Sequence, residues 1–510
     1  MSKTAIDILE RLQQQGASIG GLCADSRALR AGDAFAAYPG AHADGRRYIG
    51  DAVARGATAV LWEREGFTWD DAWRVPNVGV DGLRGLAGEL AHEVYARPSD
   101  DLWLAGVTGT NGKTSCSQWI AQALSSLGRR TALIGTLGSG FPAALGVEPA
   151  AELVPSANTT PDAVELHRRL AELLRAGAQG VALEVSSIGL DQGRVNGVRF
   201  DVALFTNFSR DHLDYHDDME RYAAAKAQLF DTPGLSGAVL NMDDVLGVRI
   251  AQKLAGGRVA CAGYSVHAGV ASAAGLEFFL EAEDIRLTQQ GLAFGLVSSW
   301  GCAEVRSSLL GRFNVANLLG VLGVLLGAGV ALDPAVAALA ALTPPPGRMQ
   351  RLGGGGKPLA VVDYAHSPDA LEEVLMSLRP LLGADAGRLT CVFGCGGDRD
   401  RGKRALMGAI AARNADQVVL TSDNPRSEDP LEIITDILEG VLREEQRPGQ
   451  APLVIADRRE AIASTIAGAA AGDVVLIAGK GHEEYQERAG RRLPFSDAAV
   501  AAEALSAWTR

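Results

Sequence analysis

A run of glycines followed by lysine and threonine carries the clearest chemical signal in this sequence. Residues 102–127 read as a buried strand, a Gly-rich turn and a helix with apolar positions three and four apart. This layout is typical of a phosphate-binding loop, although the strict consensus would require glycine at Val107. A Gly-rich turn without a ligand is the alternative. Backbone N–H groups, a lysine and an Mg²⁺-binding hydroxyl would come from Gly109, Thr110, Asn111, Gly112, Lys113 and Thr114.

Three further residues suggest a cation near this loop. Glu184 lies in an apolar strand, where a buried carboxylate needs a partner such as a metal ion. His212 and His216 are four residues apart, but the zinc-protease pattern would require glutamate at Leu213. His212 is therefore expected either to serve a hard cation or to be a hydrogen-bonded turn histidine. Lys226 lies on an apolar helix face, where an amine must be paired or modified.

Polar side chains gather at the ends of the strands predicted for the last third of the chain. Apolar strands alternate there with amphipathic helices, which predicts a parallel sheet with helices on its faces. Ligands of such sheets bind at the carboxyl ends of the strands, so we expect a binding edge, although any single residue could be a helix cap. The residues are Asp363, His366, Asp398, Arg399, Asp423, Asn424, Arg426, Asp457, Lys480, His482 and Glu483.

Two polar turns and a pair of amides are weaker candidates. Asp25-Ser26-Arg27 could hold an anionic ligand or form an ordinary turn. Asn158-Thr159-Thr160 precede a helix and would present their hydroxyls outward. Asn314 and Asn317 lie on one side of a long helix, where their amides could bind an adenine edge or cap a turn.

The elements that must position these residues form several domains, because 510 residues are too many for one core. We expect a small α/β domain over residues 1–98, a nucleotide-binding domain over 99–341 and the strand-helix alternation over 342–510. A net charge of -13 argues against nucleic acid as a partner. The N-terminal helix lacks an apolar signal core, glycines interrupt residues 318–342, and six scattered cysteines form no disulfide or zinc framework. We therefore expect a cytoplasmic protein without membrane insertion.

Motifs in all three regions resemble those of the Mur ligases, the ATP-dependent enzymes that add amino acids to peptidoglycan precursors. The family's own loop, TGTNGKT, occurs at Thr108–Thr114 and accounts for the departure from the general consensus. The resemblance implies an α/β fold with a small N-terminal α/β domain, a central P-loop ATPase-like domain and a C-terminal Rossmann-like domain. The other matches are DSR at Asp25, NTT at Asn158, EVSS at Glu184, TNFSRDHLDYH at Thr206, AAK at Lys226, GRFNVAN at Gly311, DYAHSPDAL at Asp363, GCGGDRDRGKR at Gly394 and AGKGHEEY at Ala478.

The motif DNPR, at Asp423–Arg426, is similar to that of members that add meso-diaminopimelate to UDP-N-acetylmuramoyl-L-alanyl-D-glutamate. Its arginine can fork onto a carboxylate, and lysine-adding relatives carry different residues there. The resemblance implies that ATP converts the D-glutamyl side-chain carboxylate to an acyl phosphate, which the amine of diaminopimelate attacks to give an amide, ADP and phosphate. The alternatives are a folylpolyglutamate synthase, a lysine-adding homologue, and a switch protein that hydrolyses ATP without forming a bond.

The resemblance also implies roles for single residues. The catalytic residues would be Lys113, Glu184, His212 and Lys226, with two Mg²⁺ held by Thr114, Glu184, His212 and a Lys226 carbamylated by CO₂. ATP would lie against Gly109–Thr114, Asn314, Arg348, Asp363 and His366. The UDP-muramoyl dipeptide would contact Ser26, Asn111, Thr159, Thr160, Ser186, Gln192 and Arg194. Diaminopimelate would contact Arg399, Asp423, Asn424, Pro425, Arg426, Gly479 and Glu483, the last of which would meet its distant ammonium.

One tripeptide departs from the family pattern. Relatives often carry His-Gln-Ala near the uridine, where this chain has Ala41-His42-Ala43. The resemblance therefore leaves the uridine contacts open at this point. We expect the protein to be a monomer.

Overall fold

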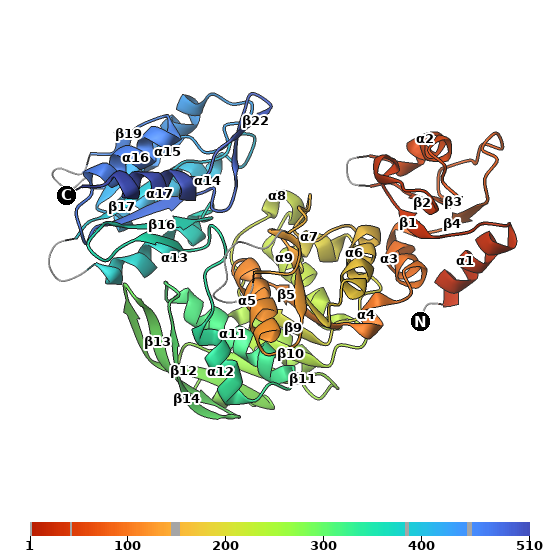
Figure 1. Ribbon diagram of the computed structural model, residues 1–510, viewed down its shortest axis with the longest axis horizontal. Helices are drawn as coiled ribbons and strands as arrows, with labels where there is room; N and C mark the ends of the chain where they lie inside the picture. Colours follow the sequence, from red (N-terminus) through yellow and green to blue (C-terminus); the bar gives the residue numbers. More distant parts are fainter. Residues whose placement is uncertain (1–2, 41–42, 144–152, 383–386, 446–450, 510) are drawn as a thin grey trace.

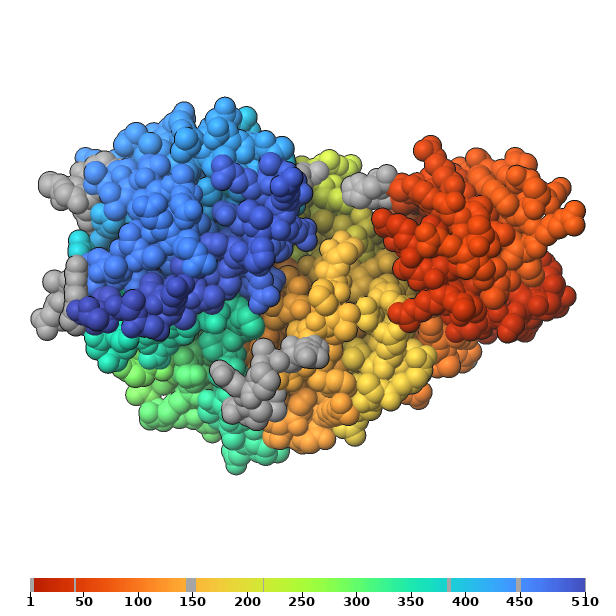
Figure 2. All heavy atoms as spheres, turned by 45° about the horizontal axis from the view of Figure 1, so that its top comes forward, coloured from red at the N-terminus to blue at the C-terminus, as the bar shows by residue number. Residues whose placement is uncertain are grey.

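The computed structural model describes residues 3–40, 43–143, 153–382, 387–445 and 451–509. Three α/β regions follow one another, and the N-terminal and C-terminal regions lie at opposite ends of the molecule with the central region between them (Figure 1 and Figure 2). The predicted fold class, α/β with three domains, is confirmed. Ala41 and His42 of the departing tripeptide lie outside the described residues.

The N-terminal region is built on a parallel sheet in the order β1-β2-β3-β4. Helices α1 and α3 bury their apolar stripes on one face, and α2 packs on the other. Val164 and Ala171 of α6, a helix of the central region, join the first of these cores. The bounds are β1 Gly21–Cys23, β2 Asp33–Ala37, β3 Ala59–Glu63, β4 Asn77–Val80, α1 Lys3–Gln14, α2 Ile49–Ala54, α3 Leu83–Val94 and α6 Ala163–Arg175.

The central region contains a ten-stranded sheet in the order β14-β13-β12-β11-β10-β9-β5-β8-β6-β7. Strands β6, β8, β5, β9, β10, β11 and β12 run parallel, whereas β7 and the β12–β14 meander are antiparallel. The short helix α4, Pro98–Asp101, directly precedes the first strand of this region. The strands are β5 Trp103–Thr108, β6 Thr131–Gly135, β7 Gly138–Gly140, β8 Gly180–Glu184, β9 Val202–Phe205, β10 Gly237–Asn241, β11 Ala260–Ser265, β12 Phe278–Thr288, β13 Gly291–Ser298 and β14 Gly301–Ser307.

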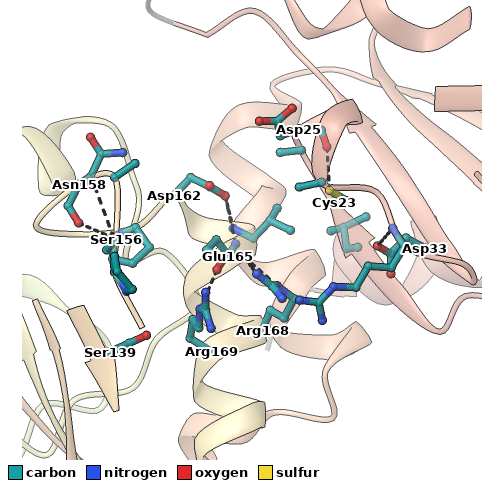
Figure 3. Close-up of a pocket in the computed structure, with 18 residues that line it drawn as sticks. Cys23, Asp25, Asp33, Ser139, Ser156, Asn158, Asp162, Glu165, Arg168 and Arg169 are labelled. Atoms are coloured by element: carbon teal, nitrogen blue, oxygen red, sulfur yellow. Dashed lines mark hydrogen bonds and ion pairs between the residues drawn. The ribbon is translucent and has the colours of Figure 1, made fainter. Parts of the chain in front are cut away.

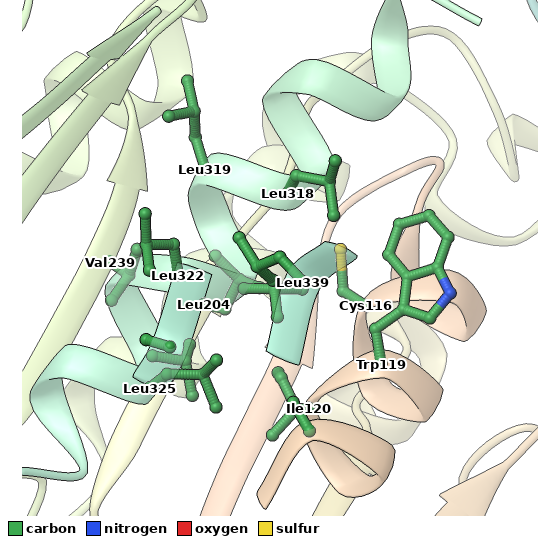
Figure 4. Close-up of a cluster of buried hydrophobic side chains, with 14 of the residues drawn as sticks. Cys116, Trp119, Ile120, Leu204, Val239, Leu318, Leu319, Leu322, Leu325 and Leu339 are labelled. Carbon is green, nitrogen blue, oxygen red and sulfur yellow. The ribbon is translucent and has the colours of Figure 1, made fainter. Parts of the chain in front are cut away.

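Helices cover both faces of this sheet. Figure 4 shows one core, where Trp119 of α5 and Leu322 of α11 pack with Leu339 of α12 against Leu204 and Val239 of the strands. Helix α11 is apolar on nearly all sides because neighbours surround it. Among the described helices, none is both long and apolar enough to cross a membrane. The bounds are α5 Lys113–Ser126, α11 Phe313–Gly327 and α12 Leu332–Ala340, and on the other face α7 Ser187–Asp191, α9 Met219–Ala227 and α10 Val245–Leu254.

The C-terminal region has a six-stranded sheet in the order β15-β16-β20-β17-β18-β19, parallel except for β15. Helices α13, α14 and α15 cover one face, and α16 and α17 cover the other. This is the predicted alternation of strands and helices. The bounds are β15 Gln350–Gly353, β16 Leu359–Asp363, β17 Leu389–Phe393, β18 Gln417–Leu420, β19 Leu453–Val454, β20 Val474–Ala478, α13 Pro368–Leu378, α14 Gly402–Asn414, α15 Pro430–Arg443, α16 Arg458–Gly468 and α17 Asp497–Ala507.

One hairpin in this region was not predicted. Strands β21, Tyr485–Arg488, and β22, Arg491–Pro494, pair through a two-residue turn. Both turn residues have positive φ, 48° at Ala489 and 72° at Gly490, which suits a turn that follows the twist of the strands. The strands lack alternating apolar residues, so only the glycine at the turn could have indicated the hairpin.

Candidate active site

The loop between β5 and α5 has the geometry of a phosphate cradle. Gly109 and Gly112 have φ of +148° and +83°, and a Cβ on Gly109 would lie 1.9 Å from the Thr206 hydroxyl oxygen. The N–H groups of Thr110 and Asn111 donate to the Asn207 backbone and side-chain oxygens at 2.8 and 2.9 Å. Helix α5 has no side-chain cap at Gly112, so its first N–H groups suit an anion. The loop therefore fits the phosphates of a nucleotide.

Two lysine amines meet at a single carbonyl of this loop. The Nζ atoms of Lys113 and Lys226 donate to Gly109 O at 2.9 and 2.7 Å, and Lys113 also donates to Thr110 O at 2.9 Å. Lys226 is 1% exposed and lies 4.4 Å from the Tyr222 ring centroid. Burial and then the neighbouring Lys113 hold the pKa of Lys226 well below its ordinary value. Lys226 therefore favours the neutral amine.

Glu184 ends β8 beside the start of α5. Its carboxylate accepts from the Thr114 hydroxyl at 2.9 Å, the Thr136 N–H at 2.8 Å and the Thr136 hydroxyl at 3.1 Å. A Cβ on Gly135 would lie 2.1 Å from Glu184 Oε1, so the strand beside the carboxylate requires glycine. Among the described residues, no three His, Cys, Asp or Glu side chains form a ready metal group. The protein thus provides a pair of hard oxygen ligands here, which fits Mg²⁺ with part of its shell supplied by water and phosphate.

His212 contacts Tyr222, the residue whose ring also lies beside Lys226. Its φ is +51°, an uncommon value for a residue with a side chain, and such outliers gather at functional sites. The rings of His212 and Tyr222 are 6.1 Å apart, and the Tyr222 hydroxyl is 3.1 Å from Thr110 Oγ1. Burial would raise the pKa of Asp211, but His212, His366 and Lys113 hold it below its ordinary value. His216 instead bonds Ser187 at 3.0 Å in a buried position.

The segment after α12 brings the C-terminal region to the phosphate loop. Arg348 Nη2 lies 3.4 Å from the Thr114 hydroxyl, its guanidinium lies 4.5 Å from the Tyr364 ring centroid, and its buried Nε has no hydrogen-bond partner among the described residues. Gly347 packs against the backbone of the β20–β21 loop, where a Cβ would lie 2.0 Å from His482 N. Arg348 is therefore placed to meet an anion on the loop.

Three other residues predicted around ATP form hydrogen bonds with residues close to them in the sequence. Asp363 is buried and accepts from the N–H groups of Met349 at 2.7 Å and Ala365 at 2.8 Å. His366 is exposed, and its Nδ1 lies 2.8 Å from Tyr364 O. The Asn314 amide donates to Leu310 O at 2.6 Å. Their roles toward the nucleotide stay predictions.

A pocket of about 250 Å³ lies between the N-terminal and central regions. In Figure 3, Glu165, Arg168 and Arg169 of α6 and its N-cap Asp162 line the pocket together with Asp25 and Asp33 of the N-terminal region, and Ser156 and Asn158 lie on the far side. Glu165 forms ion pairs with both arginines. Ser26, buried, follows Asp25 in the chain. Sequence reasoning did not identify Arg168 and Arg169, because their spacing is also that of an ordinary helix surface.

The hydroxyls predicted for the muramoyl dipeptide converge at the end of β8. Thr160 Oγ1 donates to Glu184 O at 2.9 Å and lies 3.1 Å from Ser186 Oγ, and Thr159 Oγ1 lies 3.1 Å from Thr136 Oγ1. Arg194 donates to Thr160 O at 2.8 Å and to Gln192 Oε1 at 2.8 Å. Asn111 is exposed on the phosphate loop. Thr160 is thus bonded to the main chain of Glu184, and Thr159 is linked to the Glu184 carboxylate through Thr136.

At the carboxyl edge of the C-terminal sheet, the loops after β18 and β20 meet through Asn424. Its amide donates to Glu483 Oε2 at 2.7 Å, and its oxygen accepts from Lys480 Nζ at 3.0 Å. Lys480 is fully buried and also donates to Glu483 Oε2 at 2.9 Å. Gly479, at φ +113°, leaves room for Asp423, since a Cβ there would lie 2.5 Å from Asp423 Oδ2. The predicted polar side chains thus meet at this edge of the sheet, and their role in binding stays a prediction.

Arg426 follows this network with its backbone in the left-handed region, at φ +52°. Its N–H donates to Glu487 O at 3.0 Å, its carbonyl accepts from Ala489 N at 2.7 Å, and its Nη1 donates to Gly397 O at 2.6 Å. The hairpin β21–β22 therefore holds the backbone of Arg426 in place. Arg399 is exposed on the neighbouring loop, and Pro425 is buried beneath it.

Three family patterns cover most of the chain. The Mur ligase family catalytic domain matches residues 18–95, the Mur ligase middle domain residues 107–325, and the Mur ligase glutamate ligase domain residues 347–481. The UDP-N-acetylmuramoyl-L-alanyl-D-glutamate--2,6-diaminopimelate ligase of Janthinobacterium sp. (strain Marseille) is 51% identical over 491 residues, which are 95% of this chain and 94% of that protein. The chain belongs to the Mur ligase family. The Pseudomonas aeruginosa protein of the same name is 50% identical over 96% of this chain and 95% of its own length.

Solved structures of Mur ligases share the fold. A structure of a UDP-N-acetylmuramoyl-L-alanyl-D-glutamate--2,6-diaminopimelate ligase is 38% identical, covers 96% of this chain and 95% of its own, and has a TM-score of 0.69. MurF ligase from Thermotoga maritima in complex with ADP is 18% identical over 96% of both chains, with a TM-score of 0.61, and shows the fold alone. A Mycobacterium tuberculosis folylpolyglutamate synthase shows the same, at 19% identity, 78% of this chain, 92% of its own and a TM-score of 0.59.

The sequence patterns do not single out three residues that lie in the candidate site. Thr136 donates twice to Glu184, the Tyr222 ring contacts both His212 and Lys226, and Asp211 interacts electrostatically with His212 and Lys113. Tyr222 stands on the same helix face as Lys226, four positions earlier, which was the one available signal. Thr136 lies in a turn of ordinary composition, whereas Asp211 belongs to the TNFSRDHLDYH motif, in which the two histidines were considered instead.

Proposed function

We propose that this chain joins 2,6-diaminopimelate to the D-glutamyl residue of UDP-N-acetylmuramoyl-L-alanyl-D-glutamate, with conversion of ATP to ADP and phosphate. The carboxyl edge of the C-terminal sheet is the observation that supports this substrate. Arg426 offers a guanidinium and Glu483 a carboxylate on loops that meet at Asn424. The far end of meso-diaminopimelate carries a carboxylate and an ammonium, which complement these two groups, whereas lysine has no carboxylate there.

The reaction needs an activated carboxylate, because a carboxylate anion is a poor electrophile. ATP, when bound, supplies the phosphoryl group that makes the D-glutamyl side chain an acyl phosphate. The amine of diaminopimelate then forms the C–N bond, phosphate leaves with the C–O bond broken, and the nitrogen loses a proton. Lys113, the N–H groups at the start of α5 and Arg348 would hold the phosphates against the repulsion between two anions.

Two Mg²⁺ ions would complete this electrostatic arrangement. The Thr114 hydroxyl and the Glu184 carboxylate form the oxygen pair for one ion. His212 and a carbamylated Lys226 would serve the second. These ligands would orient the substrate oxygens and reduce the charge at the reacting phosphate.

Carbamylation of Lys226 is supported by the shared carbonyl of Gly109. Two ammonium groups bound to one buried oxygen would repel each other. Burial lowers the pKa of both amines, and that of Lys226 lies well below its ordinary value. A neutral amine adds to CO₂ to give a carbamate and one proton. The product is an anion, so it would pair with Lys113 and bind a cation.

The three regions would divide the work. Residues 1–98 would hold the uridine nucleotide, residues 99–341 would hold ATP, and residues 342–510 would hold the amino acid. The pocket between the first two, bordered by Asp25 and Asn158, is where the nucleotide part of the substrate would enter. We further propose that the protein works as a monomer in the cytoplasm.

The test is phosphate release in the presence of a panel of amino acids. We expect release to require ATP, Mg²⁺, the UDP-muramoyl dipeptide and meso-diaminopimelate together, with L-lysine and D-glutamate at least about a hundredfold less effective in kcat/KM. ADP formation without both acceptor and amino acid would instead identify a nucleotide-hydrolysing switch protein. Preference for L-lysine would identify a lysine-adding enzyme.

A further inference from the structure

A buried arginine lies beneath the carboxyl edge of the C-terminal sheet. Arg458, the first residue of α16, has a side chain that is 0% exposed. Its Nε and Nη2 donate to the two carboxylate oxygens of Asp497 at 2.7 Å each. Asp497 is the first residue of α17 and is also 0% exposed. The pair joins the starts of the two helices that cover this face of the sheet.

The remaining donors of Arg458 reach two main-chain carbonyls. Nη2 donates to Ala478 O at 2.9 Å, and Nη1 donates to Ser422 O at 3.3 Å. Ala478 is the last residue of β20 and precedes Gly479, while Ser422 directly precedes Asp423. One guanidinium therefore contacts the carbonyl directly before Gly479 and the carbonyl directly before Asp423, in the two segments that carry the proposed amino-acid-binding residues.

Stability alone does not explain this arrangement. Removing two charges from water costs several kcal/mol, and replacing a buried ion pair with apolar groups of similar volume is often neutral or stabilising. The planar guanidinium group of Arg458 does, however, impose a fixed geometry on every group to which it donates a hydrogen bond. What distinguishes Arg458 from an apolar residue is thus its ability to fix the relative positions of three chain segments.

We propose that Arg458, paired with Asp497, is a positioning residue for the amino-acid site, because it fixes the two loops that carry Asn424 and Glu483 relative to each other. This rests on the function proposed above and adds a residue that does not touch the amino acid. The Asn424–Glu483 hydrogen bond of 2.7 Å is the contact that this positioning preserves.

The charge of Arg458 adds a second effect on the same site. Burial opposes the guanidinium charge, but Asp497 and then Asp423 and Glu483 raise the pKa of Arg458. The cation and its carboxylate neighbours are thus coupled through the two loops.

The test compares Arg458→Lys with a matched control, Arg459→Lys. Arg459 is the next residue and also bridges α16 to α17, through Glu503 at 3.0 Å, but it is exposed. Steady-state ligation gives KM for meso-diaminopimelate, ATP and the UDP-muramoyl dipeptide. In Arg458→Lys we expect KM for meso-diaminopimelate to rise about tenfold or more, with the other two KM values within about twofold. Arg459→Lys should behave as the unchanged protein.

Other outcomes separate the explanations. If Arg458→Lys melts at a lower temperature but keeps its KM for meso-diaminopimelate, or if all three KM values rise together, the residue is merely structural and the proposal is overturned. If Arg458→Lys does not fold, Asp497→Asn, which keeps an acceptor oxygen, gives the same test with the same expected KM split. If the unchanged protein does not use meso-diaminopimelate at all, the proposed function fails before the variants are compared.

Discussion

Replacing Arg426 with alanine should weaken one substrate and spare the others. The arginine side chain is half-buried and, among the described residues, makes one hydrogen bond, to Gly397 O at 2.6 Å. Its left-handed backbone, φ +52°, is held by Glu487 and Ala489 through main-chain bonds that alanine retains. Because alanine is about as strained as arginine at this φ, the substitution removes the guanidinium without changing the backbone cost.

The size of the effect follows from the lost contact. Hydrogen bonds to charged groups contribute about 1.5 to 3 kcal/mol each, and the substrate carboxylate would remain in the site without its partner. A net loss of about 3 kcal/mol corresponds to roughly a 150-fold decrease in kcat/KM for meso-diaminopimelate. Arg426 makes no contact with the phosphate loop among the described residues, so KM for ATP should change less than about twofold.

Initial-rate kinetics with each substrate varied in turn measure this difference. Arg488→Ala is the control, because Arg488 lies opposite Arg426 on β21 and is exposed. The control removes one positive charge from the same neighbourhood and should leave all three KM values within about twofold. Equal losses for ATP and meso-diaminopimelate in Arg426→Ala, or a similar loss in Arg488→Ala, would refute the assignment of Arg426 as the carboxylate-binding residue.

Two further predictions concern the phosphate loop and acid stability. Lys226→Ala should reduce kcat by about a hundredfold or more, and added bicarbonate should not restore the activity. The control is Lys253→Ala, which removes a lysine from an exposed ion pair and should retain activity. Full activity in Lys226→Ala would exclude the carbamate from the mechanism. Arg404 and the Asp398 N–H hold the pKa of Glu428 at about 2, below its ordinary 4.5, so this stabilisation is complete above about pH 4.5 and is lost as pH falls toward 2. Glu428→Gln should therefore lower the melting temperature at neutral pH, and the difference should shrink in acid; a difference that does not depend on pH would contradict this reasoning.

Much of the fold could be predicted because its strands and helices repeat strong local patterns. The strands of the C-terminal sheet are short apolar runs between amphipathic helices, so β16 to β20 follow from the sequence. The hairpin β21–β22 could not be predicted in the same way, because β21 is only partly buried, β22 is exposed, and neither strand has an apolar face. A strand shows alternating apolar residues when one of its faces is buried, and no residue of either strand in this hairpin is fully buried.

Some residues of the candidate site could likewise be predicted from local sequence, and others could not. Gly109–Thr114 could be identified because the backbone demands glycine at two positions, and Glu184 because a carboxylate stands out in an apolar strand. The approach of Arg348 to Thr114 spans 234 positions in the sequence and depends on how two regions pack. No local composition encodes that distance, and arginine is too common in loops to draw attention by itself.

The contact of Gly347 with the β20–β21 loop bears on how such enzymes could exchange parts. A Cβ on Gly347 would lie 2.0 Å from His482 N, so this glycine and the loop that it contacts should come from the same parent protein. The next residue, Arg348, reaches the phosphate loop of the other region. A chimaera that takes its amino-acid module from a relative should therefore be joined before residue 347, in the proline run at Pro344–Pro346. Such a junction would transfer the arginine with the new module and leave the nucleotide site complete.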